Sequence, residues 1–528
     1  MRSIVNTPIE QLSQQARRAA QARDWRAVKA FAQEIIGRRR NSAEGRFLLG
    51  LAEAGTGRWE PATKAFQTAI KLDGNRYDAA IELAWLYMEL GRFNEAVQII
   101  ARFESSLGNS PMYLDKAARI YINVNLPDKA LPLLRKANEL QPGIDSLQAN
   151  LAECLVFVGE ISEAESIYRG LLDKNPDHQR NNYEFARIRR ATDEAHIEHM
   201  KQVLERSGRP PEGNVFLYYA LGKELEDLER WDEAFDFYKR GGDAARSQLD
   251  YDVGDDVAMV DTVIDYCNSD WLQKATAAAE REQSEKTPVF IVGLPRSGTT
   301  LTERILTCHS QVESIGESYF MREAVHKASR ARFEEAMSPA IIKAASSKDP
   351  AIIARKYLAS VAYKFGDKPF FIEKFPENAL YLGFIAAGFP DARIILQTRN
   401  PMDSCFAMYK QSYFRYAYSL DDLGAYYVAY DRLITHWRET LGDRLVEVNY
   451  ESTVSNQEAE TRRLLDELRL RFEEACLHFE KNVTPSNTAS TVQVREKAHT
   501  RSVRRWTRYE KQLQSLQEHL ERAGIDTD

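Results

Sequence analysis

Apolar and small residues recur at a fixed interval through the first half of the chain, with helical spacing between them. Five positions follow one another at a period of about 34 residues: Trp25, Trp59, Phe93, Pro127 and Ile161. A small or β-branched residue stands three positions after each of them: Val28, Ala62, Ala96, Ala130 and Ala164. Three of the five also follow a glycine, which favours a turn that ends the preceding helix. The pattern therefore predicts pairs of antiparallel helices that approach closely at the small residue.

This interval, together with helix breaks at Pro142 and Pro176, resembles the tetratricopeptide repeat. The resemblance covers roughly residues 9–247, with a less regular stretch at 178–211 and a last copy of the motif at 229–234. It implies an all-α solenoid over residues 1–250, in which most aromatic residues pack between helices. The concave face of such a solenoid would be the surface that binds a protein partner.

The periodicity changes after a polar stretch at 283–287. Residues 288–293 form a short apolar run, which is typical of a buried parallel strand. A loop follows, and then a helical pattern that carries Leu301, Ile305 and Leu306. A strand, loop and helix in this order direct backbone N–H groups and a helix N-terminus at one point, which suits a phosphate. We expect a connecting segment at 251–286 and a separate domain at 287–528.

The loop has the glycine spacing of a Walker A sequence, from Gly293 through Gly298 to Thr300, but it differs at one position. Thr299 stands where nucleotide-triphosphate enzymes need a lysine for the β- and γ-phosphates. Arg296, earlier in the loop, can supply positive charge instead. The sequence thus disfavours ATP or GTP hydrolysis and favours a nucleotide with a single phosphate at this end.

Several ordered motifs resemble the sulfotransferase family: residues 295–301, 308–310, 316–317, 371–378 and 392–403. The resemblance spans roughly residues 288–519, and Gly316-Glu317 and residues 490–494 favour the tyrosylprotein branch. It implies a P-loop-like α/β sulfotransferase domain of three layers with a parallel sheet. It also implies 3′-phosphoadenosine 5′-phosphosulfate as the sulfonate donor. We interpret the chain as a multidomain, tetratricopeptide-containing sulfotransferase.

Sulfuryl transfer needs a base, charge for the sulfonate oxygens and donors for the leaving oxygen. By resemblance, Glu317 is the base, Lys374 neutralises the leaving oxygen and Ser490 donates to it. Arg296 would bind the 5′-phosphate and the sulfonate. The rest of the loop supplies donors for the same phosphate, through Pro295, Ser297, Gly298, Thr299 and Thr300. His309, a further base candidate, is expected to have a structural role.

The resemblance also implies a subsite for the 3′-phosphate. Arg399 resembles the arginine that binds this phosphate, and Arg505 stands in place of a basic residue ahead of Trp506. The family usually has a serine eight residues after the arginine, where this chain has Ala407, so Ser404 is a substitute candidate. Arg505 lies in a basic run that fits either a solvated helix face or a flap over the donor.

Composition and charge narrow the class of protein. Apolar residues make up 44% of the chain, charged residues 28%, and the net charge of -7 disfavours nucleic acid as a partner. No apolar run reaches the roughly 18 residues of a membrane span. The five cysteines are scattered without paired spacing, which favours a reducing, cytoplasmic location. No cluster of His, Cys and carboxylate residues suggests a metal, so we expect metal-free catalysis.

Three functions remain open at this point. The first is an enzyme that transfers a sulfonate to a hydroxyl, with tyrosine of a peptide or protein ahead of a glycan as acceptor. The second is a nucleotide kinase or NTPase, which shares the loop geometry and could use Glu373 at a strand end, but lacks the lysine. The third is a scaffold whose repeats bind partners while the C-terminal domain has lost activity, as Ala407 would suggest.

Overall fold

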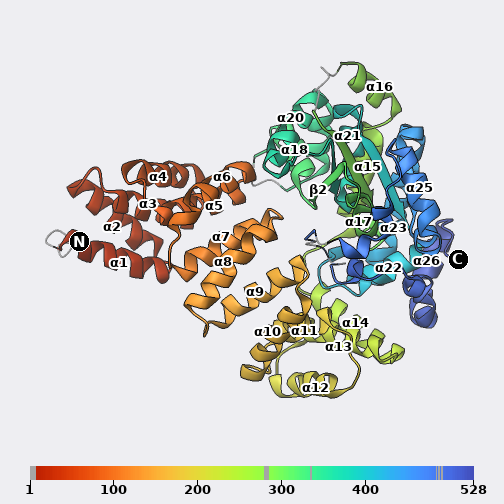
Figure 1. Ribbon diagram of the computed structural model, residues 1–528, viewed down its shortest axis with the longest axis horizontal. Helices are drawn as coiled ribbons and strands as arrows, with labels where there is room; N and C mark the ends of the chain where they lie inside the picture. The colour runs from red at the N-terminus through yellow and green to blue at the C-terminus, as the bar shows by residue number, and fades with distance from the viewer. Residues whose placement is uncertain (1–6, 279–284, 333–335, 483, 486–487, 489–490) are drawn as a thin grey trace. The chain divides into compact units, whose positions relative to one another are not determined.

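The computed structural model describes residues 7–278, 285–332, 336–482, 484–485, 488 and 491–528. The chain forms two compact units, Met1–Leu151 and Ala152–Asp528. The first unit consists of helix pairs (Figure 1), and α9 (Asp145–Val158) runs across the boundary. Its helices are α1 (Ile9–Gln21), α2 (Trp25–Arg38), α3 (Ala43–Gly55), α4 (Trp59–Leu72), α5 (Tyr77–Glu89), α6 (Phe93–Phe103), α7 (Pro111–Asn123) and α8 (Pro127–Leu140).

Each residue of the predicted 34-residue series is the first residue of a helix. The small residue three positions later is fully buried in every case, from Val28 to Ala164, because it faces the partner helix of the pair. The turn before each helix needs a left-handed residue, which is Gly57, Gly91 or Gly159 in three repeats. Arg23, Asn125 and Glu229 adopt the same positive φ in the repeats that lack glycine. The tetratricopeptide prediction is thus confirmed.

The second unit begins with further repeat helices: α10 (Ile161–Lys174), α11 (Gln179–Ile188), α12 (Ala195–Ser207), α13 (Val215–Asp227) and α14 (Trp231–Arg246). Two connecting helices follow, α15 (Val253–Tyr266) and α16 (Ser269–Ala278). The compact units therefore divide the chain earlier than the sequence pattern does. The boundaries at 250 and 286 mark a change of pattern, and as domain limits they stay a prediction.

A parallel sheet forms the centre of the second unit. Its strands are β1 (Thr287–Gly293), β2 (Val312–Gly316), β3 (Phe370–Lys374), β4 (Arg393–Thr398) and β5 (Leu445–Asn449). Among the described residues the strand order is β2-β3-β1-β4-β5, and all pairs are parallel. β3 and β4 flank β1 on its two sides, so the loop after β1 lies at the switch point where open α/β sheets bind ligands.

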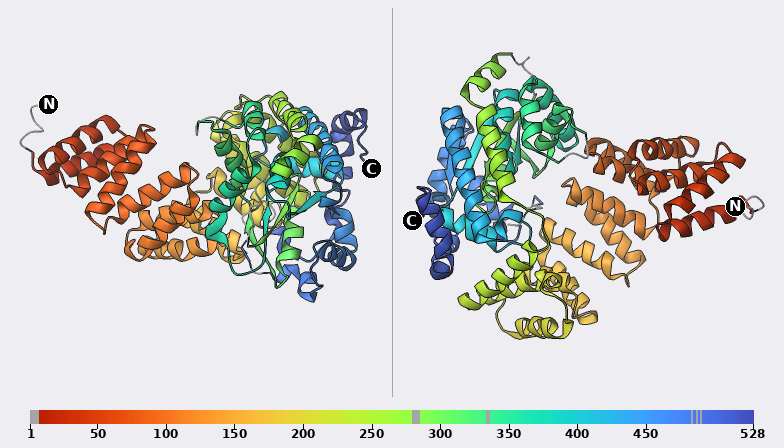
Figure 2. Two further views of the ribbon diagram at one scale, coloured as in Figure 1. Left: turned by 90° about the horizontal axis from the view of Figure 1, so that it is seen from above. Right: turned by 180° about the vertical axis from the view of Figure 1, so that it is seen from behind.

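Helices cover both faces of this sheet, giving three layers (Figures 1 and 2). On one face, Val289 and Ile291 of β1 pack with the helices α17 (Thr299–Thr307) and α25 (Gln457–Glu467). On the other face, Phe290 packs on Tyr357 of α20 (Pro350–Val361), with ring centroids 5.7 Å apart. Alternate residues of a strand point to opposite faces, which is why β1 is apolar throughout. The predicted fold class is confirmed.

The remaining helices complete these layers and the C-terminal end. They are α18 (Phe320–Ser329), α19 (Pro339–Ser346), α21 (Leu382–Gly388), α22 (Pro401–Tyr409), α23 (Leu420–Leu441), α24 (Tyr450–Ser455) and α26 (Glu510–Arg522). No helix in the described part of the chain is both long enough and apolar enough to cross a bilayer.

The last repeat helices share one hydrophobic core with the α/β domain. Phe235 of α14 stacks on Tyr409 of α22 at 5.7 Å, and Trp231 meets Tyr509 edge to face at 5.8 Å. Arg246 of α14 also bonds Asp422 of α23 at 2.7 Å. Because these contacts are buried and continuous, α10–α14 belong to the same compact unit as the sheet.

Candidate functional site

The loop between β1 and α17 forms a cradle for an anion. Gly298 caps α17 with a φ of 110° and no side-chain cap, and within the described ranges the N–H groups of Thr299 and Thr300 have no acceptor, so they can bind a ligand. A Cβ at Gly298 would lie 2.6 Å from Cδ2 of Tyr450, so only glycine fits there. Ser297 is buried, and its Oγ donates to the Leu294 carbonyl at 2.7 Å. The hydroxyl of Ser297 thus closes the loop on itself.

Two pockets meet at this loop. The first, which we call the loop pocket, has a volume of about 530 Å3 and is lined by Glu317 and most of the loop, namely Pro295, Arg296, Gly298, Thr299 and Thr300. The second, which we call the Arg399 pocket, has a volume of about 550 Å3 and includes Arg399, Ala407 and Arg505. Both pockets include Arg296, Gly298 and Thr300, so the loop lies between them.

Glu317 and Lys374 form an ion pair beside the loop pocket. Glu317 follows β2 and Lys374 ends β3, which are neighbouring parallel strands, so the carboxyl ends of the strands bring the two residues together. The Lys374 side chain is fully buried, whereas Glu317 is 32% exposed toward the pocket. Burial raises the pKa of the Glu317 carboxyl, and the positive charge of Lys374 opposes that rise.

Glu373, the neighbouring strand residue, faces away from both pockets. It is fully buried and accepts a hydrogen bond from Ser318. Burial raises its pKa to about 7 and is opposed by the Ser318 and Tyr357 hydroxyls and by Lys364. No group of three or more His, Cys, Asp or Glu residues in the described ranges is arranged to hold a metal ion.

Arg399 is hydrogen-bonded to the backbone of the loop at Arg296. Arg399 donates from Nη1 to the Arg296 carbonyl at 2.8 Å and from Nη2 to the Ser502 carbonyl at 2.6 Å. Its guanidinium lies 4.7 Å from the centre of the Tyr450 ring. Arg296 donates to Oε1 of Gln493 at 2.7 Å, and its pKa is lowered, mainly by burial and further by the nearby Arg399. Both arginines line the Arg399 pocket, and two guanidinium groups in one pocket favour an anionic ligand.

The other residues predicted from the sequence differ in whether they line a pocket. Ser404 is buried in α22 and lines neither pocket, whereas Ala407 lines the Arg399 pocket. Ser490 lies outside the described residues. His309 is buried, with Nε2 2.9 Å from the Arg471 carbonyl and Nδ1 accepting from the Gln311 N–H at 3.1 Å. Both ring nitrogens of His309 are thus engaged in holding backbone.

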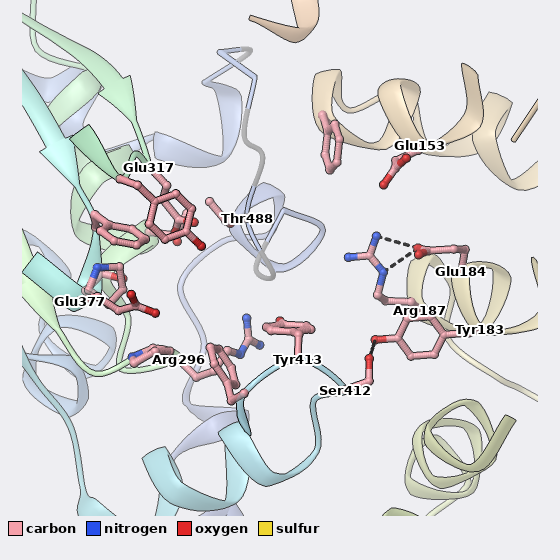
Figure 3. Close-up of a pocket in the computed structure, with 18 of the residues that line it drawn as sticks. Glu153, Tyr183, Glu184, Arg187, Arg296, Glu317, Glu377, Ser412, Tyr413 and Thr488 are labelled. Atoms are coloured by element: carbon pink, nitrogen blue, oxygen red, sulfur yellow. Dashed lines mark hydrogen bonds and ion pairs between the residues drawn. The ribbon is translucent and has the colours of Figure 1, made fainter. Parts of the chain in front are cut away.

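Sequence reasoning missed the part of the site that comes from the repeats. Tyr183 and Arg187 of α11 line both pockets, and Figure 3 shows them across the loop pocket from Glu317. The Tyr183 hydroxyl contacts Ser412 at 3.3 Å, and Arg187 pairs with Glu184 at 2.8 Å. The irregular stretch at 178–211 was the available signal, because a repeat that packs on another domain departs from the pattern of its neighbours.

A parallel α/β domain with a glycine loop at the switch point of its sheet has a P-loop-like fold. Residues 288–474 match the sulfotransferase family, and residues 53–120 and 125–182 match the tetratricopeptide repeat. The chain thus joins a region that matches tetratricopeptide repeats to a region that matches the sulfotransferase family.

Relatives are distant but consistent with this. An uncharacterized protein of Aquifex aeolicus (strain VF5) is 28% identical over 421 residues, covering 78% of this chain and 55% of the relative. Protein-tyrosine sulfotransferase 1 of Danio rerio is 25% identical over 219 residues, covering 39% of this chain and 59% of the relative. The chain therefore spans little more than half the length of either. The solved repeat protein YrrB, with an unusual peptide-binding site, matches 39% of this chain and 96% of its own at 17% identity, with a TM-score of 0.29.

Proposed function

We propose that this protein transfers the sulfonate group of 3′-phosphoadenosine 5′-phosphosulfate to a hydroxyl, with tyrosine of a peptide or protein ahead of a glycan as acceptor. The observation that carries the proposal is the Glu317–Lys374 pair beside the loop pocket. Glu317 lines the pocket, whereas Lys374 is buried behind it and lines neither pocket. A carboxylate at the pocket with an ammonium bonded to it can remove a proton from an acceptor and neutralise a departing oxygen in the same step.

The residues present fit the donor at its sulfated end. The open N–H groups of α17 and the Arg296 guanidinium can bind the 5′-phosphate and sulfonate oxygens. Glu317, with a raised pKa and partial exposure, takes the proton of the acceptor hydroxyl. Lys374 stabilises the charge that develops on the bridging oxygen as the S–O bond breaks.

The acceptor would enter through the loop pocket, whose walls are rich in aromatic rings. Tyr319 and Phe375 stand edge to face at 4.9 Å on the side of Glu317, and Tyr183 and Phe216 lie 5.5 Å apart on the repeat side. Aromatic walls suit a phenol better than a sugar, because rings stack and pack by their faces. The repeat helices would then help to recruit the acceptor as well as a protein partner.

A nucleotide kinase or NTPase is less well supported. Thr299 stands in place of the triphosphate lysine, and Glu373 is buried against Ser318 away from both pockets. A cytoplasmic location is part of the proposal, since none of the five cysteines, all within the described ranges, forms a disulfide.

Binding and transfer test the proposal together. Calorimetry of the full chain should detect adenosine 3′,5′-bisphosphate without a metal and a far weaker signal for ATP with magnesium. Incubation with labelled donor and separate peptide, glycan and phenol acceptors should then label a tyrosine peptide. Tight ATP binding with no bisphosphate binding would overturn the proposal. Bisphosphate binding with no transfer to any acceptor would support the scaffold function instead.

A further inference from the structure

Glu226 of the repeat helix α13 holds two cations of the sulfotransferase domain. Its carboxylate accepts hydrogen bonds from Nζ of Lys410 at 2.8 and 3.0 Å and from Nε of Arg505 at 3.2 Å. The Tyr238 hydroxyl donates a further bond to it at 2.9 Å. Glu226 is almost fully buried, so these contacts are shielded from bulk water. Charged hydrogen bonds are stronger in such an environment than in solvent.

Glu226, Lys410 and Arg505 all line the Arg399 pocket. Lys410 follows Ala407 by three positions, so the two lie on one face of α22 and its last turn. Ala407 is the position where a serine is expected in the family and no hydroxyl is available. The Lys410 ammonium is thus a donor one helical turn from Ala407, in the wall of the same pocket.

The side chains around the Arg399 pocket carry more positive than negative charge. The pKa of Lys410 is lowered, mainly by burial, and although Glu226 opposes this, the neighbouring Arg505 and Arg296 lower it further. The hydrogen bond between Arg505 and Glu226 uses Nε, and the guanidinium lies 4.7 Å over the Trp231 ring. Among the described residues, the Nη groups of Arg505 make no hydrogen bond and Lys410 bonds only Glu226, so both cations have donors for a ligand of the Arg399 pocket. In the described part of the chain, Glu226 is the one carboxylate bonded to the two cations Lys410 and Arg505, so the group keeps a net positive charge. Such a group suits a dianionic phosphate.

We propose that Lys410 and Arg505 bind the 3′-phosphate of the donor, with Lys410 replacing the hydroxyl absent at Ala407, and that Glu226 positions both cations. The repeat array is then part of the donor site and not only a recruiting surface. This inference rests on the proposed function, because it assigns residues to one phosphate of that donor.

The test is the preference of the full chain for adenosine 3′,5′-bisphosphate over adenosine 5′-monophosphate, measured by calorimetry. Lys410→Met and Glu226→Gln should each reduce this preference about tenfold, while affinity for the monophosphate stays unchanged. Glu226→Asp keeps the charge and should restore part of the preference. Glu82→Gln is the matched control, since it removes a similar repeat carboxylate, bonded to Lys116 at 2.6 Å, and should change neither affinity.

A further variant tests whether the effect of Lys410→Met comes only from a loss of fold. Ala407→Ser in the Lys410→Met background should recover part of the preference, which a structural defect would not allow, and thermal unfolding checks each variant. If the wild-type chain does not distinguish the two nucleotides, the proposed function fails and the inference with it. If the wild type does, but Lys410→Met keeps the preference or Glu226→Gln increases it, the inference alone is overturned.

Discussion

Lys374 donates a hydrogen bond to the Glu317 carboxylate at the carboxyl ends of two neighbouring parallel strands. The contact joins the residue proposed to take a proton to the residue proposed to stabilise the leaving oxygen. Burial raises the pKa of the Glu317 carboxyl, and the ammonium opposes that rise. The pair therefore affects both the pKa and the position of the proposed base.

Replacing Glu317 by Gln should abolish transfer without loss of nucleotide binding. A glutamine keeps the shape of the side chain but cannot accept a proton, and general bases contribute about 100-fold or more to rate. Transfer of labelled sulfonate to a tyrosine peptide measures the first effect, and bisphosphate calorimetry measures the second. Glu447→Gln on β5, whose carboxylate pairs with Arg438 at 2.8 Å, is the control and should retain activity. Full activity in the Glu317 variant would remove it from the base role.

The pH dependence of transfer should change when Lys374 is replaced by Met. The base acts when it is deprotonated, so kcat/KM rises with pH through the Glu317 pKa. Burial raises that pKa and Lys374 lowers it, so loss of the ammonium should shift the acidic limb of the profile to higher pH. The maximal rate should also fall, because the leaving oxygen loses its counter-charge. An acidic limb that stays in place or moves to lower pH would contradict the pairing.

Gly298→Ala should weaken both the fold and nucleotide binding. A Cβ there would lie 2.6 Å from Tyr450, and the φ of 110° disfavours any other residue, at a cost of about 1–3 kcal/mol. Thermal unfolding and bisphosphate calorimetry check the two effects. Gly170→Ala, on α10 with open space around it, is the matched control and should stabilise the chain by up to about 1 kcal/mol. Equal behaviour of the two variants would show that the loop does not need glycine.

Phe216→Ala should raise the KM for a tyrosine peptide by about three- to tenfold and leave bisphosphate affinity unchanged. Phe216 lies on the repeat side of the loop pocket, 5.5 Å from the Tyr183 ring, and does not line the Arg399 pocket. Steady-state kinetics with varied peptide and saturating donor separate the two effects. Met112→Ala, an exposed apolar residue of α7, controls for general changes in the repeats. An unchanged KM for the peptide would exclude this wall from acceptor binding.

Local patterns predicted the elements of this protein well. The repeat interval gave the first residue of each second helix, including Trp231 of the last repeat, and the loop from Gly293 to Thr300 has the predicted strand before it and helix after it. These features follow from backbone hydrogen bonding and the side-chain period of each element, which neighbouring residues determine. The placement of Ser404 was harder, since one position along a helix decides whether a side chain faces a pocket or the core.

The sequence by itself determined the repeats, the parallel α/β domain, the anion cradle and the candidate residues Glu317 and Lys374. Only the tertiary structure decided which of them meet. Glu226 and Lys410 are 184 positions apart, and their contact exists because α13 and α14 bury their apolar faces against α22 and α26. Such burial depends on the complementary shapes of two surfaces that are far apart in the sequence. The local spacing of apolar residues does not reveal which surfaces will pack together. The contribution of the repeat helices to both pockets therefore depends on tertiary packing and could not be read from the sequence.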